Sequence, residues 1–504
     1  MMKTYPNSVI AKFVNNAAHN FNLKLEHKNA LYYILATYFL IYVSVGYQIN
    51  LTQYSPDSWA YFELSKTIFT EDFYKLNTFR SYFSVVHSAS FPFGWPAIIA
   101  LTSIVVGANP LNAVYINIIL ATISILVIFR IGKNLTLPLI FSFLVCSALL
   151  FYRPYTNEVF SGRSMPLAIL VFLIAFYFHQ RNILFLAGLF LGLSALVRFD
   201  FLVYAIIFQM IAVSIVRMET KKYFSLVFGF LIGILPWILY SYINFEKFWV
   251  SDNSWVAISA LPAFVVDYPA VPVVSALNDP ITWLSRVLGN FIPLLKSIIK
   301  STVFFPIFVV FICFTFVNFN FINLEMRHKL AALLLGGVFG VMPYMLTGYF
   351  DSRYFALIFL IGSASLIYAL NSNADLKYLG FSLKGLSFLL IILTISSGLT
   401  FLVRDVVIGK ANLVNVINQE NQIKNLYSCH LEDSKNTYIF MNEARGIAPR
   451  YGALTGMRTA FIPSNFDRMT NIEKSNYFKF MQPYVLIDSI SKAEKCTSQK
   501  IMTP

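Results

Sequence analysis

Long apolar runs separated by short polar connections dominate the pattern of this chain. Many runs approach 20 residues, the length that an α-helix needs to cross a hydrocarbon layer of about 30 Å. The pattern therefore predicts an all-α polytopic membrane protein with about eleven transmembrane helices. Their approximate limits are 30–47, 111–131, 135–152, 164–178, 183–197, 201–217, 223–243, 303–318, 330–347, 353–370 and 383–402.

The apolar run 93–107 is not counted as a span. It is short, it begins in Pro92-Phe93-Gly94-Trp95-Pro96, and it is followed by Pro110. Runs of this length are more often interfacial or re-entrant than spanning, and the sequence leaves open whether this one crosses. Counting it would reverse the side of every later loop.

The distribution of Lys and Arg favours this topology. Six segments on the side of the N-terminus carry fourteen basic residues, whereas three short connections on the opposite side carry four. Cytoplasmic loops carry the excess of Lys and Arg, so the N-terminal segment 1–29 is predicted to be cytoplasmic. The scheme requires that the runs 183–197 and 201–217 are separate helices meeting at Arg198-Phe199-Asp200.

Composition excludes an ordinary soluble protein. The chain is 57% hydrophobic and 12% charged, whereas about a quarter of the residues of a soluble protein are charged. The net charge of +14 does not indicate a nucleic-acid partner, because many of the basic residues lie in short connections between apolar runs. Cys429 and Cys496 lie in the polar tail, where they are able to pair only in an oxidising compartment.

The topology divides the chain into the lead-in 1–29, a transmembrane domain 30–402 and a tail 403–504. Two large outer loops are predicted at about 48–92 and 244–302. In the tail, 437–441 and 484–488 have the pattern of short strands. We therefore expect the tail to form a small C-terminal α/β domain on the outer side.

The candidate functional residues all emerge on this outer side. Asp57 follows the first span, and a carboxylate there is either a general base for a hydroxyl or a helix-capping residue after Pro56. Glu158 either orients a sugar or acceptor or forms a surface ion pair with Arg153 or Arg163. His87 is either a binding residue or an incidental loop residue.

Two arginines are candidates for binding a phosphate, because the planar guanidinium group binds two oxygens at once. Arg353, followed by Tyr354, opens a late apolar run, and Arg198 lies in a short outer connection. The alternatives are that Arg353 extends to the lipid headgroups and that Arg198 pairs with Asp200. No metal or cofactor site is indicated.

In this order, the motifs resemble those of the GT-C integral-membrane glycosyltransferases, which take sugars from polyprenyl-phosphate carriers. The motifs are 54–61, 91–101, Asn157-Glu158, 196–200 and 351–354, and the tail string 451–458 is also similar. Relatives often carry a paired acidic motif or His-Pro-Pro in the first loop. Here Ser58 follows Asp57, and His87 is separated from Pro92.

The resemblance implies an inverting hexosyltransferase in the bacterial inner membrane. Its donor would be a hexose on undecaprenyl phosphate, and its acceptor would be a cell-envelope glycan such as the lipopolysaccharide O-antigen. Asp57 would serve the acceptor hydroxyl, and Arg353, with Arg198, would hold the departing phosphate. Lipid A aminoarabinose transferases and protein O-mannosyltransferases belong to the same group.

Two other classes remain open from the sequence. A flippase or transporter of lipid-linked sugars would show repeated halves and broken helices facing the midplane. An O-antigen polymerase or ligase would depend on arginine pairs in its large outer loop, and here the loop 244–302 holds only Arg286.

Overall fold

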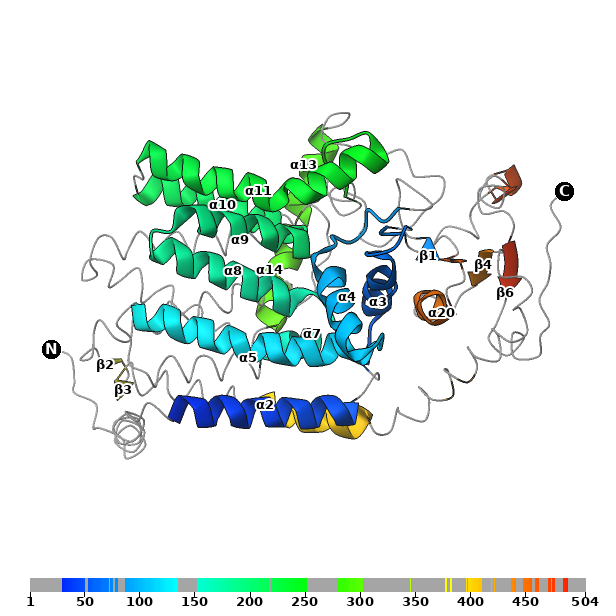
Figure 1. The fold of residues 1–504 in the computed structure, drawn as a ribbon, viewed down its shortest axis with the longest axis horizontal. Helices are drawn as coiled ribbons and strands as arrows, with labels where there is room; N and C mark the ends of the chain where they lie inside the picture. The colour runs from blue at the N-terminus through cyan, green and yellow to red at the C-terminus, as the bar shows by residue number, and fades with distance from the viewer. Residues whose placement is uncertain are drawn as a thin grey trace.

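The structure is a computed structural model, and it describes the following segments of the chain (Figure 1). They are residues 30–49, 53–71, 73–75, 78–79, 87–134, 152–216, 219–251, 280–301, 345, 377–378, 381–382, 396, 398–409, 418, 421, 437–440, 447–455, 458–461, 470–472, 474–475 and 484–487.

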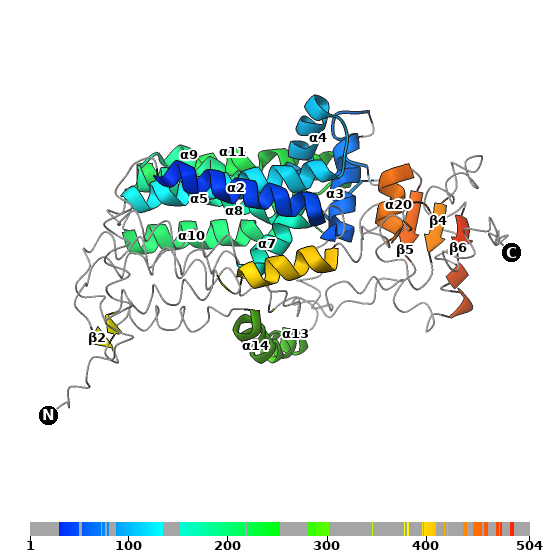
Figure 2. The same ribbon diagram turned by 90° about the horizontal axis from the view of Figure 1, so that it is seen from below.

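Six helices lie side by side and form the main bundle (Figures 1 and 2). They are α2 (Ala30–Ile49), α5 (Leu111–Asn134), α8 (Met165–Gln180), α9 (Leu184–Val197), α10 (Asp200–Val216) and α11 (Thr220–Phe245). Their facing apolar side chains form a continuous core, in which Trp237, Ile118 and Leu191 are buried.

Two of the described helical segments, Leu111–Ile131 and Thr220–Phe245, are long and apolar enough to cross a membrane by length and composition. Helices α7 (Arg153–Phe160) and α8 are bent by 114° and would together form a third such segment. Of the other predicted spans, 30–47, 183–197 and 201–217 correspond to helices with shorter apolar segments. The spans 135–152, 303–318, 330–347, 353–370 and 383–402 lie largely or wholly outside the described residues, so the number eleven remains a prediction.

Helices α9 and α10 are separate, as the predicted topology requires. Helix α9 ends at Val197 because Arg198 adopts an extended conformation, with φ −152° and ψ 129°. Helix α10 then begins at Asp200, an acidic residue in the first turn, where it complements the helix dipole.

Three short helices, α3 (Pro56–Thr67), α4 (Gly94–Val106) and α7, gather at one end of the bundle (Figure 1). Helix α4 contains the run that was excluded from the spans, and with 13 residues it is shorter than a spanning helix. A Cβ atom on Gly46 of α2 would lie 3.0 Å from Ile118 of α5. The end of α2 and the start of α5 are therefore neighbours, and α4, which lies between them in the chain, stays on the side where α2 ends and α5 begins.

Four strands form a parallel sheet in the order β1-β5-β4-β6. Strands β4 (Thr437–Phe440) and β6 (Tyr484–Ile487) coincide with the two predicted strands. Between them along the chain lie α20 (Ile447–Thr455) and β5 (Arg458–Phe461). The edge strand β1 (Thr78–Phe79) comes from the first outer loop and pairs with β5, so the sheet is built from two distant parts of the chain.

The remaining described elements lie outside the bundle. Helices α13 (Pro280–Gly289) and α14 (Phe291–Ser301) belong to the second large loop and are set apart from the bundle in Figure 2. A two-stranded antiparallel sheet consists of β2 (Lys377–Tyr378) and β3 (Phe381–Ser382).

Helices α9 and α11 are in backbone contact through glycines. A Cβ atom added to Gly188 would lie 1.8 Å from the carbonyl oxygen of Leu226, and one added to Gly229 would lie 2.1 Å from that of Phe185. Small residues permit such close approach between membrane helices.

Replacing Gly188 by Ala is therefore expected to force the two backbones apart and to destabilise the protein by about 1–3 kcal/mol or more. The measurement is the thermal unfolding midpoint in detergent. Gly289→Ala is the matched control, because a Cβ atom there meets nothing within 4 Å. Equal midpoints for the two variants would show that the helices are less tightly packed than described.

Candidate functional site at one end of the helical bundle

The first part of the site is the start of helix α3. Ser55 is its N-cap, and the Ser55 side chain accepts a hydrogen bond of 3.2 Å from the backbone N–H of Ser58. Pro56 occupies the first turn, where its missing N–H group costs nothing. Asp57 also lies in the first turn without being the cap. Its carboxylate there is favoured by the helix dipole, and its side chain is half-buried.

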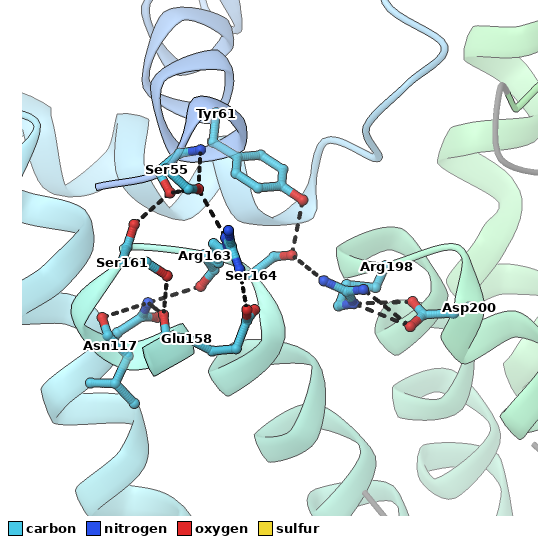
Figure 3. A network of polar contacts seen from close by, with 11 residues as sticks. Ser55, Tyr61, Asn117, Glu158, Ser161, Arg163, Ser164, Arg198 and Asp200 are labelled. Atoms are coloured by element: carbon cyan, nitrogen blue, oxygen red, sulfur yellow. Dashed lines mark hydrogen bonds and ion pairs between the residues drawn. The ribbon is translucent and has the colours of Figure 1, made fainter. Parts of the chain in front are cut away.

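The second part is an ion pair at the junction of α7 and α8 (Figure 3). The Arg163 Nη1 donates to Glu158 Oε1 at 2.7 Å. The Glu158 side chain is 1% exposed and that of Arg163 is 23% exposed. The surface ion pair considered for Glu158 is therefore a buried one. Arg163 also donates from Nε to the Ser55 hydroxyl at 2.9 Å, so the same arginine holds the cap of α3.

The backbone between α7 and α8 is fixed by bonds from three helices. Trp95 of α4 donates from Nε1 to the Gly162 carbonyl at 3.0 Å, and Asn117 of α5 donates to the Arg163 carbonyl at 2.8 Å. The Ser58 hydroxyl of α3 donates to the Ser161 carbonyl. Gly162 has φ +72°, which favours glycine, and a Cβ atom there would lie 2.6 Å from the Tyr54 ring.

The third part is the turn between α9 and α10 (Figure 3). Arg198 donates to both carboxylate oxygens of Asp200, at 3.0 and 3.3 Å from Nε and 3.2 Å from Nη2. Its Nη1 reaches the Ser164 hydroxyl at 3.4 Å, and that hydroxyl shares a 3.0 Å hydrogen bond with the Tyr61 hydroxyl. Tyr61 thus joins α3 to both turns.

Charges from all three parts act on Tyr61. Its hydroxyl is buried, and burial raises its pKa to about 12, with Arg198 opposing the shift and Asp57 and Glu158 adding to it. Tyr61 is therefore a neutral phenol at pH 7. Three predicted site residues, Asp57, Glu158 and Arg198, consequently lie within electrostatic range of one hydroxyl group.

Helix α4 contacts the α9–α10 turn as well. A Cβ atom on Gly94 would lie 2.6 Å from the carbonyl oxygen of Leu196. Two motifs of the sequence, the Pro/Gly-rich start of α4 and the string 196–200, are thus in direct contact.

The remaining predicted site residues are His87, Arg353 and Tyr354. His87 forms an isolated bridge with Lys75, and its ring lies 6.5 Å from that of Tyr240 on α11. Burial, with a contribution from Lys75, lowers the pKa of His87, so its ring is neutral at pH 7. Arg353 and Tyr354 lie outside the described residues, and their convergence on the site remains a prediction.

Sequence reasoning missed the residues that join the parts of the site. Tyr61, Ser164 and Asn117 carry the cross-links between helices. A signal existed for Asn117, because an amide within an apolar run is often a hydrogen-bonding partner for a neighbouring helix. The capping role considered for Asp57 is wrong, because Ser55 is the cap of α3; a serine directly before a proline is a signal for such a cap. In the part of the chain that the structure describes, no three His, Cys, Asp or Glu side chains are grouped to hold a metal ion.

Comparison with solved structures reveals a likeness in fold. The chain is similar to ArnT from Cupriavidus metallidurans bound to undecaprenyl phosphate, with a TM-score of 0.55, 9% identity, and 89% of this chain and 92% of that chain covered. It is also similar to the archaeal oligosaccharyltransferase AglB from Archaeoglobus fulgidus in complex with an inhibitory peptide and a dolichol-phosphate. That match has a TM-score of 0.51 and 12% identity, and it covers 86% of this chain and 65% of that one. No family model and no curated protein sequence matches.

Proposed function

The chain has the fold of the GT-C integral-membrane glycosyltransferases, and from this premise we propose that it transfers a sugar from a polyprenyl-phosphate carrier to a cell-envelope acceptor. The observation that carries the proposal is the polar network that joins α3, the α7–α8 junction and the α9–α10 turn at one end of the bundle. ArnT and AglB, which share the fold, were each solved with a polyprenyl-type phosphate.

Asp57 is the proposed general base. Its carboxylate takes the proton of the acceptor hydroxyl while the hydroxyl oxygen attacks the anomeric carbon of the donor sugar. The bond between that carbon and the phosphate oxygen breaks, and the lipid phosphate leaves with the electron pair. Attack from the side opposite the leaving group inverts the configuration of the sugar.

The departing phosphate needs a cation to stabilise its developing charge. We assign this role to Arg353, with Tyr354 beside it in sequence. Arg198 is engaged by Asp200 through three hydrogen bonds, which favours the structural alternative raised for it. Glu158 is paired with Arg163, and we assign to this pair the positioning of α3 against α7.

The finer details of the proposal come from the family resemblance. The donor is a hexose such as glucose on undecaprenyl phosphate, the acceptor is the O-antigen, and the reaction takes place at the periplasmic face of the inner membrane. His87 is proposed to contact the substrates from the first loop.

The test is a transfer assay with the purified protein in lipid nanodiscs. Radiolabelled undecaprenyl-phosphate glucose, presented with cell-envelope glycolipids, is expected to label the glycolipid fraction. The nucleotide-linked sugar is expected to label nothing, because the proposed chemistry uses a lipid-bound donor. Other undecaprenyl-phosphate sugars in the same assay identify the hexose.

The rival functions give different results. A flippase would move the labelled lipid between the leaflets of proteoliposomes without forming a labelled glycan. A polymerase or ligase would consume preassembled glycan on a lipid diphosphate and leave the single-sugar donor intact. Either result would overturn the proposal.

A further inference from the structure

The middle of helix α3, which begins one residue after Asp57, is enclosed on all sides. Eight consecutive residues, Ser58 to Ser65, are buried, although a helix at the surface of a bundle usually buries only one face. Helix α4 and the α7–α8 junction cover the sides toward the bundle. The side facing away from the bundle is covered by α20 of the tail, and Figure 2 shows α3 between the bundle and α20.

A row of side chains leads from α20 to the polar site. The Arg450 guanidinium lies over the Trp59 ring at 5.3 Å from its centroid. The Trp59 ring is in edge contact with that of Tyr54 at 4.8 Å. The Tyr54 ring fills the space beside Gly162, where a Cβ atom would lie 2.6 Å from it. Arg450 and Trp59 are 6% and 3% exposed, so this contact is shielded from water.

Two further contacts attach the tail to the same loop. The Lys66 amine, near the end of α3, donates to the Ala453 carbonyl of α20. Strand β1 of the first loop pairs with β5, with Thr78 opposite Thr459. The tail therefore contacts the loop both at α3 and beyond it.

We propose that the tail is a clamp for the catalytic helix and that Arg450 is its positioning residue. Arg450 holds Trp59, and Trp59 is two residues from Asp57 in the first turns of α3. Packing through Tyr54 fixes the start of the helix against Gly162. The consequence for sugar transfer rests on the proposed function, whereas the mechanical part does not depend on it.

Hydrogen exchange of the full-length protein in nanodiscs tests the mechanical part. In Arg450→Ala, the backbone amides of residues 58–61 are expected to exchange about five- to thirtyfold faster, the factor that corresponds to the loss of a desolvated cation–π contact. Arg450→Lys keeps a cation over the ring and is expected to retain most of the protection. Arg404→Ala is the matched control, because Arg404 lies over the Phe401 ring at 5.1 Å and is 46% exposed.

Three exchange results would overturn the clamp. They are unchanged exchange in Arg450→Ala, equal exchange in the Lys and Ala variants, and the same acceleration in Arg404→Ala. In a Trp59→Leu background, Arg450→Ala is expected to add no further acceleration, since Arg450 acts through Trp59. A full additional acceleration there would also contradict the proposal.

A transfer assay with undecaprenyl-phosphate glucose supplies the second readout. Arg450→Ala is expected to lower kcat at least about fivefold with little change in the KM of the donor, because the proposal has Arg450 act through Trp59 and not on the donor. A rise in KM at unchanged kcat would contradict positioning. If the native protein itself transfers no sugar, the proposed function fails, and the exchange result still decides whether the clamp exists.

Discussion

Replacing Asp57 by Asn is expected to reduce sugar transfer by about 10²–10⁴-fold, the usual contribution of a general base. The amide has the shape of the carboxylate but does not accept the proton of the acceptor hydroxyl. Asp57 is not the N-cap of α3, and the interaction of its charge with the helix dipole is worth about 0.3–1 kcal/mol. The protein is therefore expected to fold and to insert into membranes normally.

The measurement is the initial rate of label transfer at saturating donor, with the thermal unfolding midpoint recorded for each variant. Glu71→Gln serves as the control, because Glu71 is an exposed acidic residue of the same loop. It is expected to keep full activity. A near-normal rate for Asp57→Asn would show that Asp57 is not the general base.

Replacing Arg163 by Met is expected to destabilise the protein by about 3–5 kcal/mol, because it leaves the buried Glu158 carboxylate without its cation. The Ser55 hydroxyl, which caps α3, loses its bond to Arg163 in the same step. The expected result is a clear fall in the thermal unfolding midpoint, measured by intrinsic tryptophan fluorescence.

Two further variants test whether the loss of stability comes from the burial of the Glu158 charge and not from the loss of any ion pair. Lys222→Met breaks an exposed pair with Glu219, whose side chains are 52% and 72% exposed, and is expected to change stability by no more than about 1 kcal/mol. The double variant Arg163→Met with Glu158→Leu removes both charges and is expected to recover much of the loss. If the double variant is as unstable as Arg163→Met alone, the charge of Glu158 is not the cause.

Part of this architecture could be predicted because membranes impose strong rules on sequence. The break between α9 and α10 followed from Arg198 and Asp200, two charges that a continuous membrane helix would have to bury. The strands β4 and β6 followed from short apolar runs flanked by polar residues. The exclusion of α4 from the spans followed from its short length and from the prolines and glycines at its two ends.

The detailed geometry of the site could not be predicted in the same way. Whether Glu158 pairs with Arg153 or Arg163 depends on the bend between α7 and α8, which has no periodic signal in the sequence. Arg153 instead lies over the Phe401 ring and 3.8 Å from Asp405, near the predicted end of the transmembrane domain. The contact between Tyr61 and Ser164 joins residues 103 positions apart, and only the packed helices bring them together.

The shared sheet has a consequence for biosynthesis. The contact between Lys66 and Ala453 closes a separation of 387 residues, and strand β1 has no partner until β5 has been made. Long-range pairings of this kind form late, because the intervening chain must first be ordered. The first loop therefore reaches its final form only after strand β5 has been synthesised.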